Sequence, residues 1–388
     1  MTTGFVRGNH LTLLYNGADY FPALLEAIAA AQREIYLESY LFEVDVVGIA
    51  VLEALIAAAA RGAQVSLQID GFGARHFPAE WRQKLADAGV RQLFFRPEVG
   101  RFSLNRQRLR RLHRKLAVID GQVGFIGGIN ILSDLDSPDL APRYDYAVRV
   151  HGPLVAQMRE TANRLWRHTA WVQLVPDWAK TLPAPQMPMR AGKSLAKLVI
   201  RDNFRNRHAI EQEYLRAIET ARDEIIIANA YFLPGYRFRH ALLRAAERGV
   251  NVVLLLQGRV DHALLHYASR GFYRSFLKAG VEIYEYREGF MHAKVAVVDR
   301  YWATVGSSNI DPFSLLLARE GNIAVRDHGL AVALRDDLRS RLSEDASQIA
   351  LVDLRRGRWL FRVLPWISHG IVRILMAISG YGGKRYLE

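Results

Sequence analysis

Short apolar segments alternate with longer alanine- and leucine-rich segments along most of this chain. Apolar runs rich in β-branched residues predict buried strands, and the longer segments predict helices. In the first half, an apolar run over 34–42 is followed by a helix that ends at Arg61-Gly62 and by a second apolar run over 65–70. Glycine is favoured just after the last residue of a helix, which supports that boundary. Strands and helices in this order predict an α/β layered fold with a largely parallel sheet.

The same order of segments occurs a second time. The run over 224–232 resembles 34–42, the next helix ends at Arg248-Gly249, and an apolar run over 252–256 follows. Because 388 residues exceed the usual size of one domain, we expect two similar α/β domains. The expected division is a first domain over 1–175, a proline-rich linker over 176–194, a second domain over 195–350 and a basic, apolar C-terminal segment over 351–388.

A polar motif stands at the same place in both halves. Its two copies follow the pattern H-x-K-x4-D-x6-G-[GS]-x-N without any change in spacing. The copies contain His113, Lys115, Asp120 and Asn130 in the first half and His292, Lys294, Asp299, Ser307 and Asn309 in the second. Each motif opens an apolar run that predicts a β-hairpin with its turn at the aspartate. Alternate residues of a strand point to one face, so the histidine and lysine of each copy project together.

Paired histidines and lysines suit the transfer of a phosphodiester. Lys115 and Lys294 can bind the anionic oxygens, while Asn130, Asn309 and Ser307 can add hydrogen bonds. One histidine can attack phosphorus as the other protonates the leaving alkoxide and then deprotonates an acceptor, because imidazole titrates near neutral pH. An ordinary structural role for these histidines and lysines is disfavoured, since a buried lysine without a partner is costly.

Composition limits the chemistry and leaves the partner open. The chain contains no cysteine, which excludes disulfides, a thiolate nucleophile and a cysteine-ligated metal. The other histidines show no metal-ligand spacing, so we expect no metal and no cofactor. The net charge of +13 favours an anionic partner, either nucleic acid or anionic lipid. The basic stretch Arg101–Arg114 is compatible with a solvated surface and with an entrance that recruits anionic lipid.

The C-terminal segment has a composition of its own. Residues 355–378 combine arginines and tryptophans with an apolar run that is interrupted by Pro365, His369 and Arg373. This run is too short and too broken for a membrane-spanning helix. It favours a segment that lies at a membrane interface. A terminal helix that covers the second domain is the alternative.

The duplicated motif resembles that of the phospholipase D superfamily, whose members carry two HKD motifs at one active site. Other stretches are similar to the bacterial cardiolipin synthases within it. The absence of N-terminal transmembrane helices favours their shorter type. The similar stretches are Gly8-Asn9, 13–17, 35–42, 105–115, Gly127–Asn130 and Asp311–Ser314.

This resemblance implies two similar α/β/α lobes that are related by a pseudo-two-fold axis and share one active site. It also implies a carboxylate behind each histidine, for which Glu320, after the second motif, and Asp145, its counterpart in the first half, are the candidates. By the same resemblance, His113 is expected to be the nucleophile and His292 the acid and base. We expect Asp120 and Asp299 to form hydrogen bonds near the turns rather than to touch phosphate.

The implied reaction is phosphatidyl transfer between two molecules of phosphatidylglycerol, which gives cardiolipin and glycerol. The enzyme would be peripheral, at the cytoplasmic face of a bacterial membrane, and would need no metal. A hydrolytic phospholipase D and a nuclease of the same superfamily remain alternatives. Nucleic acid is the less favoured substrate because the C-terminal segment is apolar. A binding module without activity is disfavoured because both motifs keep their H, K and N residues.

Overall fold

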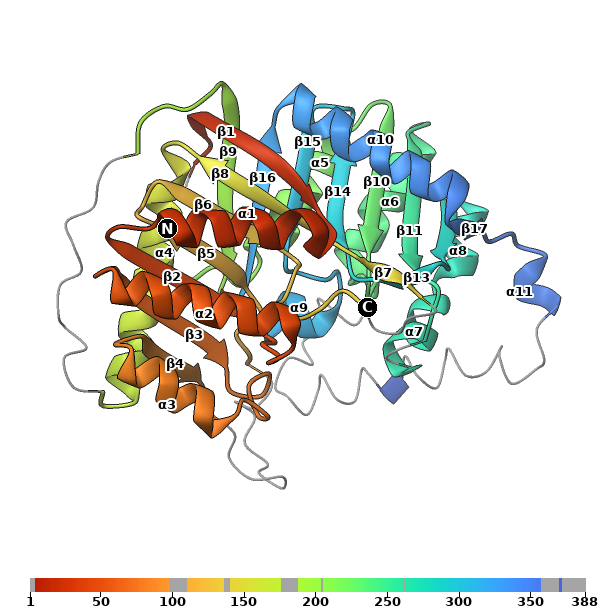
Figure 1. Cartoon of the computed structure of the whole chain (residues 1–388). Helices are drawn as coiled ribbons and strands as arrows, with labels where there is room; N and C mark the ends of the chain where they lie inside the picture. The colour runs from red at the N-terminus through yellow and green to blue at the C-terminus, as the bar shows by residue number, and fades with distance from the viewer. Residues whose placement is uncertain are drawn as a thin grey trace.

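The computed structural model describes residues 4–97, 110–135, 140–175, 188–203, 205–260, 263–356 and 370–371. Two lobes lie side by side, and the order of their elements is similar (Figure 1). The first lobe comprises β1 (Val6–Tyr15), α1 (Asn16–Ala30), β2 (Glu34–Ser39), α2 (Val46–Ala60), β3 (Gln64–Asp70), α3 (Ala79–Asp87), β4 (Arg91–Phe95), β5 (Lys115–Ile119), β6 (Val123–Gly127), β7 (Ala141–Tyr144), β8 (Tyr146–His151) and α4 (Leu154–Val172). The second comprises β9 (Ser194–Arg201), α5 (Ala209–Thr220), β10 (Glu224–Asn229), α6 (Tyr236–Glu247), β11 (Asn251–Gln257), α7 (Ala263–Arg270), α8 (Tyr273–Lys278), β12 (Glu282–Tyr286), β13 (Gly289–Met291), β14 (Lys294–Val298), β15 (Trp302–Gly306), α9 (Pro312–Leu316), β16 (Glu320–Arg326), α10 (His328–Glu344), β17 (Ala346–Gln348) and α11 (Asp353–Arg356).

One sheet runs through both lobes. Its order is β17-β12-β11-β10-β14-β15-β16-β9-β1-β8-β6-β5-β2-β3-β4. The antiparallel pair β1 and β9, the first strand of each lobe, joins the two halves at its centre. The strands β7 and β13 form a separate parallel pair, which also brings the two lobes together.

The expectation of a largely parallel sheet is wrong. Within this sheet the described parallel pairings are β2-β3-β4 and β10-β11-β12, whose strands are joined by helices. The other pairings are antiparallel, and tight turns join the strands of two of them, β5 to β6 and β14 to β15. The sheet is therefore mixed, and the α/β class and the two similar lobes are confirmed.

Helices pack on both faces of the sheet in each lobe. In β5, Leu116 packs in one cluster with Met158 of α4, whereas the next residue, Ala117, packs in another with Leu24 of α1 and Leu52 of α2. This alternation follows from strand geometry. It explains why the central strands are apolar at almost every position.

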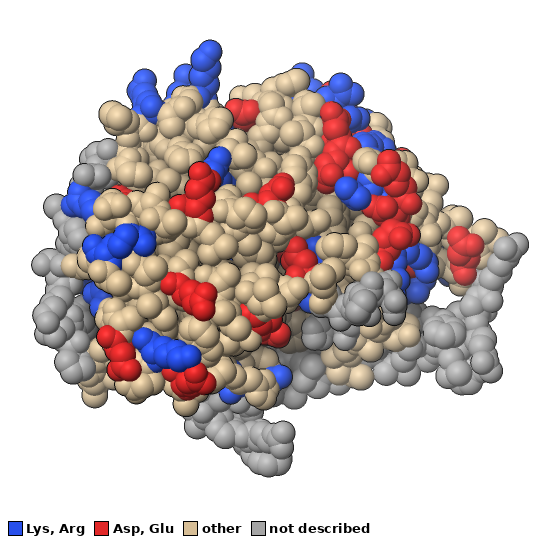
Figure 2. Space-filling model, in the orientation of Figure 1, with Lys and Arg blue, Asp and Glu red and all other residues tan. Residues whose placement is uncertain are grey.

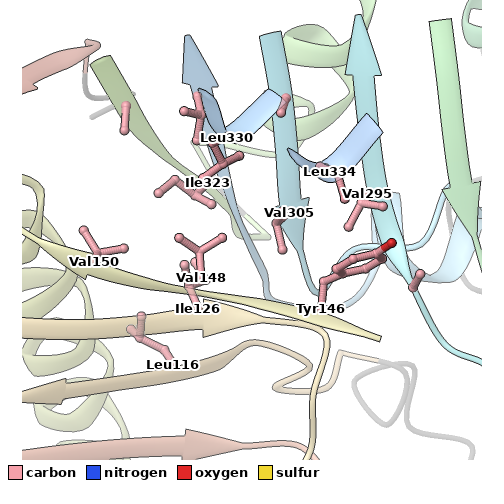
Figure 3. Close-up of a cluster of buried hydrophobic side chains, with 14 of the residues drawn as sticks. Leu116, Ile126, Tyr146, Val148, Val150, Val295, Val305, Ile323, Leu330 and Leu334 are labelled. Atoms are coloured by element: carbon pink, nitrogen blue, oxygen red, sulfur yellow. The ribbon is translucent and has the colours of Figure 1, made fainter. Parts of the chain in front are cut away.

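The two lobes share a hydrophobic core. Figure 3 shows Ile126 and Val148 of the first lobe near Ile323 and Leu330 of the second, and all four belong to one buried cluster. Val305 of β15 belongs to the same cluster. Such a core is closely packed and resists displacement, so it fixes the position of one lobe relative to the other.

Several sequence features lie outside the described residues. These are the basic stretch up to residue 109, the linker residues 176–187, and the C-terminal segment apart from 351–356 and 370–371. Within the described part of the chain, we find no helix with the length and apolar character needed to cross a membrane. On the face in Figure 2, acidic and basic side chains are interspersed, so the excess positive charge does not collect in one patch there.

Candidate active site

The two motif histidines each bind a carboxylate that comes from the other lobe. Nδ1 of His113 in the first lobe forms a hydrogen bond of 3.2 Å with Oε2 of Glu320 in the second, and Oε1 of the same carboxylate lies 3.0 Å away. Nδ1 of His292 in the second lobe lies 2.7 Å from Oδ2 of Asp145 in the first. A carboxylate at Nδ1 favours a proton on that nitrogen, which leaves Nε2 of the neutral ring with a lone pair. The site thus presents two oriented imidazoles.

Main-chain hydrogen bonds hold the same crossed arrangement. The backbone N–H of His113 donates to the carbonyl of Arg319, at 2.9 Å, and that of His292 donates to the carbonyl of Tyr144, at 2.7 Å. Arg319 and Tyr144 immediately precede Glu320 and Asp145. Each histidine is therefore fixed by two consecutive residues of the opposite lobe.

The two motif lysines are buried beside the histidines. Nζ of Lys115 donates to the carbonyl of His113, at 2.7 Å, and Nζ of Lys294 donates to that of His292. Lys294 also lies 3.7 Å from Asp145. Burial lowers the pKa of Lys115 to about 7 and that of Lys294 to about 8. An anion bound between them would favour their charged forms and reverse these shifts.

Burial also controls the protonation of the histidines and of Asp145. It lowers the pKa of His113, although Glu320 opposes this shift, and it lowers that of His292 well below its usual range. Lys294 and Lys115 lower the pKa of His292 further. Burial raises the pKa of Asp145 to about 6. Without a bound anion, both histidines are thus neutral near pH 7, which suits a nucleophile.

The motif aspartates anchor the hairpin turns. Asp120 and Asp299 both have positive φ, at 52° each, and the turns they open are the expected ones. The carboxylate of Asp120 accepts from the backbone N–H groups of residues 32, 33 and 34 at 2.8–2.9 Å. That of Asp299 accepts from residues 222, 223 and 224 at 2.8–3.0 Å. These bonds tie each hairpin to the start of β2 or β10.

The remaining motif residues contact the protein in different ways. Oδ1 of Asn130 accepts from the backbone N–H of Leu41, at 3.1 Å. Oδ1 of Asn309 is buried and has no hydrogen-bond partner among the described residues. The hydroxyl of Ser307 donates to Oε2 of Glu320, at 2.5 Å. Ser307 therefore supports the carboxylate behind His113.

Gly128 takes the place of Ser307 in the first motif, and its lack of a side chain is required. A Cβ at residue 128 would lie 2.2 Å from Oδ1 of Asp145. The shorter aspartate thus stands beside a glycine, whereas the longer Glu320 stands beside a serine.

Two neighbours of the site were missed in the sequence. The ring of Tyr40 lies 4.7 Å from that of His113 and 5.3 Å from Nζ of Lys115, measured to ring centroids. Tyr40 follows the carboxyl end of β2, where α/β sheets commonly bind ligands, and this position could have indicated it. Arg114 makes a buried bidentate pair with Glu38, with bonds of 2.6 and 2.7 Å. Residue 293 of the second motif is alanine, so the repeat gave no sign of this pair.

No group of three or more potential metal ligands of the His, Cys, Asp and Glu types occurs in the described residues. Charged groups around the histidines include the two lysines, Glu320, Asp145 and Arg143.

Comparison with known proteins identifies the family. The model of the family described as cardiolipin synthase, PLD-like domain, matches residues 24–166 and 214–342, one stretch in each lobe. The chain belongs to this family. Cardiolipin synthase B of Escherichia coli strain K12 is 38% identical over 394 residues, which cover 98% of this chain and 92% of the relative. Cardiolipin synthase A of Pseudomonas aeruginosa is 31% identical, over 85% of this chain and 66% of that protein.

A solved structure shows the same fold. Phosphatidylserine synthase of Haemophilus influenzae superposes with a TM-score of 0.73, at 14% identity, over 98% of this chain and 96% of that one. The fold is thus that of a phospholipase D-like enzyme.

Proposed function

We propose that this chain is a cardiolipin synthase that transfers a phosphatidyl group through a phosphohistidine on His113. The observation that carries the proposal is the pair of cross-lobe contacts, His113 with Glu320 and His292 with Asp145, beside two buried lysines. The relatives named cardiolipin synthase B support the same substrate class.

The first step forms a covalent intermediate. The lone pair on Nε2 of His113 forms a bond to phosphorus as the bond to the glycerol oxygen of phosphatidylglycerol breaks. That oxygen takes a proton from Nε2 of His292 and leaves as glycerol. Lys115 and Lys294 offset the negative charge on the phosphate oxygens.

The second step reverses the proton transfer. His292 takes the proton from a hydroxyl of a second phosphatidylglycerol, whose oxygen forms a bond to phosphorus while the bond to His113 breaks. The product is cardiolipin, and His292 regains the proton it needs. Two displacements replace one difficult attack of an alcohol on a phosphodiester anion.

His292 must carry a proton in the first step although burial lowers its pKa. The bound anionic phosphodiester raises the pKa of His292 again, because a negative charge close to the ring favours imidazolium. Asp145 adds to this effect through the 2.7 Å contact with Nδ1. Substrate binding thus prepares the acid that the reaction uses.

We further propose that the enzyme acts as a peripheral protein at the cytoplasmic face of a bacterial membrane. The net charge of +13 supports this, since anionic lipids attract a basic protein. The basic, apolar C-terminal residues are consistent with an interfacial segment.

Product analysis with defined lipids tests the reaction. The purified full chain is incubated with phosphatidylglycerol in detergent micelles, and products are measured by mass spectrometry. We expect cardiolipin and glycerol from the wild type and from the control His208→Ala, whose side chain is exposed. His113→Ala and His292→Ala should form neither.

Other products would overturn the proposal. Phosphatidic acid without cardiolipin would indicate a hydrolytic phospholipase D. Nicking of plasmid DNA without any lipid product would indicate a nuclease. Equal cardiolipin formation by His113→Ala and the wild type would exclude the phosphohistidine.

A further inference from the structure

A groove of about 520 Å³ lies beside α4, outside the pair of catalytic histidines. Its wall combines apolar residues with cationic ones. The lining includes Leu165, Leu198, Ile200, Arg164, His168 and Arg319. Its volume falls within the range of small-molecule binding sites.

The pseudo-symmetry identifies the place in the other lobe that corresponds to this groove. Gly127 and Gly306 occupy equivalent positions in the two motifs, and they pair with residues 147 and 322. Residues 147 and 322 are therefore equivalent. Counting back from them, Tyr144 corresponds to Arg319 and Tyr146 to Gly321.

The helices are matched by a second set of contacts. Arg159 of α4 binds Glu34, just as Arg335 of α10 binds Glu224. This equivalence makes Thr161 the counterpart of Asp337.

The corresponding place in the other lobe is filled. There, the hydroxyls of Tyr144 and Tyr146 both bind Oδ2 of Asp337, at 2.7 and 2.6 Å. Tyr144 also stacks on Tyr286 with ring centroids 5.4 Å apart. On the groove side, Arg319 stands in place of Tyr144, Gly321 in place of Tyr146, Thr161 in place of Asp337 and Phe95 in place of Tyr286. The place beside α10 is therefore filled by side chains, whereas the corresponding place beside α4 is an open groove.

Arg319 gives the groove a site for an anion. Its Nε atom is buried and has no hydrogen-bond partner among the described residues. The side chain lies over the ring of Phe95, at 5.6 Å, and burial lowers its pKa to about 10. A buried arginine donor without a partner is costly, and a phosphate oxygen would satisfy it.

The acidic residues of the lining suit a headgroup with hydroxyls. Glu160 and Asp202 also line the groove. Glu160 already binds Arg164, at 3.2 Å, and Asp202 binds Asn206, at 2.7 Å. The carboxylate of Glu160 can also accept from the hydroxyls of a glycerol headgroup.

The groove meets an exposed apolar rim at the end of α4. A second hollow shares Glu160, Arg164 and His168 with it and extends to Arg167 and Trp171. Trp171 is 57% exposed and Leu174, just beyond the helix, is 85% exposed. Tryptophan and arginine beside exposed aliphatic residues are typical of surfaces that meet a bilayer.

We propose that this groove binds one molecule of an anionic phospholipid with a glycerol headgroup, in addition to the lipid at the catalytic histidines. Its phosphate binds Arg319, and an acyl chain lies along Leu165, Leu198 and Ile200. Arg319 immediately precedes Glu320, which binds His113, so the occupied groove stabilises the residue that orients His113.

Binding of a soluble lipid tests the site without turnover. We would use a His113→Ala background, which blocks turnover, and titrate dihexanoyl phosphatidylglycerol, below its micelle concentration, by calorimetry, with the groove and the catalytic site fitted as two separate sites. Arg319→Leu and the groove-filling Thr161→Trp should each weaken binding about tenfold or more. Arg237→Leu, which removes an exposed arginine of α6, should leave the Kd unchanged.

Three results would overturn the site. One is a Kd unchanged by Arg319→Leu in protein with wild-type circular dichroism, and another is no binding at all. The third is equally tight binding of glycerol phosphate or dihexanoyl phosphatidylcholine, because the first lacks the chains and the second lacks the net charge. If Thr161→Trp does not fold, the Kd of Arg319→Leu alone tests whether the groove binds the lipid. Failure of the groove leaves product formation intact, which separates this result from failure of the proposed reaction.

Discussion

Glu320 of the second lobe lies 3.0 Å from Nδ1 of His113 in the first lobe. The reciprocal contact joins Asp145 of the first lobe to His292 of the second. Neither lobe alone therefore contains a complete pair of histidine and carboxylate. The active site exists only where the shared core holds the lobes together.

Replacing Glu320 by glutamine should mainly lower kcat. The amide keeps the shape of the side chain but loses the charge that stabilises imidazolium and fixes the tautomer of His113. In catalytic triads a comparable change costs about 10⁴-fold, and we expect a loss on the order of 10²–10⁴-fold here. The measurement is the rate of cardiolipin formation at saturating phosphatidylglycerol.

Ser307→Ala is the matched control for that variant. It removes one hydrogen bond to Glu320, worth about 1 kcal/mol, and keeps the charge. Its rate should fall by less than about tenfold. Similar losses in both variants would argue that the charge of Glu320 has no special role.

The pH dependence of kcat/KM should be bell-shaped and narrow. Asp145, with a pKa of about 6, must be ionised, so activity should rise as pH rises through that value. The lysines must be charged, and a lowered pKa means that they lose their protons as pH rises through about 7 for Lys115 and about 8 for Lys294. Activity should therefore fall above this range, far below the usual lysine pKa of about 10.4. A profile that stays flat up to pH 9 would contradict the burial of these charges as the controlling factor.

Binding of a phosphate analogue should take up protons. An anion between Lys115 and Lys294 raises the pKa of both lysines and of the histidines, so protons are drawn from the buffer. Calorimetric titration with vanadate, repeated in buffers of different ionisation enthalpy near pH 8, measures this uptake directly. Lys115→Met should bind vanadate more weakly and take up fewer protons, whereas Lys278→Met, at the end of α8, should behave like the wild type.

The motif aspartates should govern stability more than chemistry. Asp120→Ala leaves three backbone N–H groups without their acceptor, which we expect to cost about 3 kcal/mol. The melting temperature should fall, while the rate per folded molecule at low temperature should stay within about threefold of the wild type. Asp299→Ala should behave in the same way, because its three bonds are equivalent. Loss of turnover in a fully folded Asp120→Ala protein would instead assign this carboxylate to the chemistry.

Much of this architecture could be predicted from the chain, because duplicated strands, helices and turns leave local signals. Asp120-Gly121 and Asp299-Arg300 were expected at turns, and their positive φ angles agree. Strand direction was mispredicted because strands buried on both faces have the same apolar sequence whether they are parallel or antiparallel. The exchange of Glu320 and Asp145 between lobes could not be foreseen either. It depends on the shared core and on the β7–β13 pair rather than on any local pattern.

Gly128→Ala should disturb the site through Asp145 alone. The added Cβ would lie 2.2 Å from Oδ1 of Asp145, so the carboxylate must move away from His292. We expect kcat to fall about tenfold or more and the acid limb of the pH profile to shift, since that limb reports Asp145. Ser307→Gly, the reverse exchange at the equivalent position, creates space and should leave the acid limb unchanged. An unshifted acid limb in Gly128→Ala, with the fold intact, would show that the contact between Asp145 and His292 does not set it.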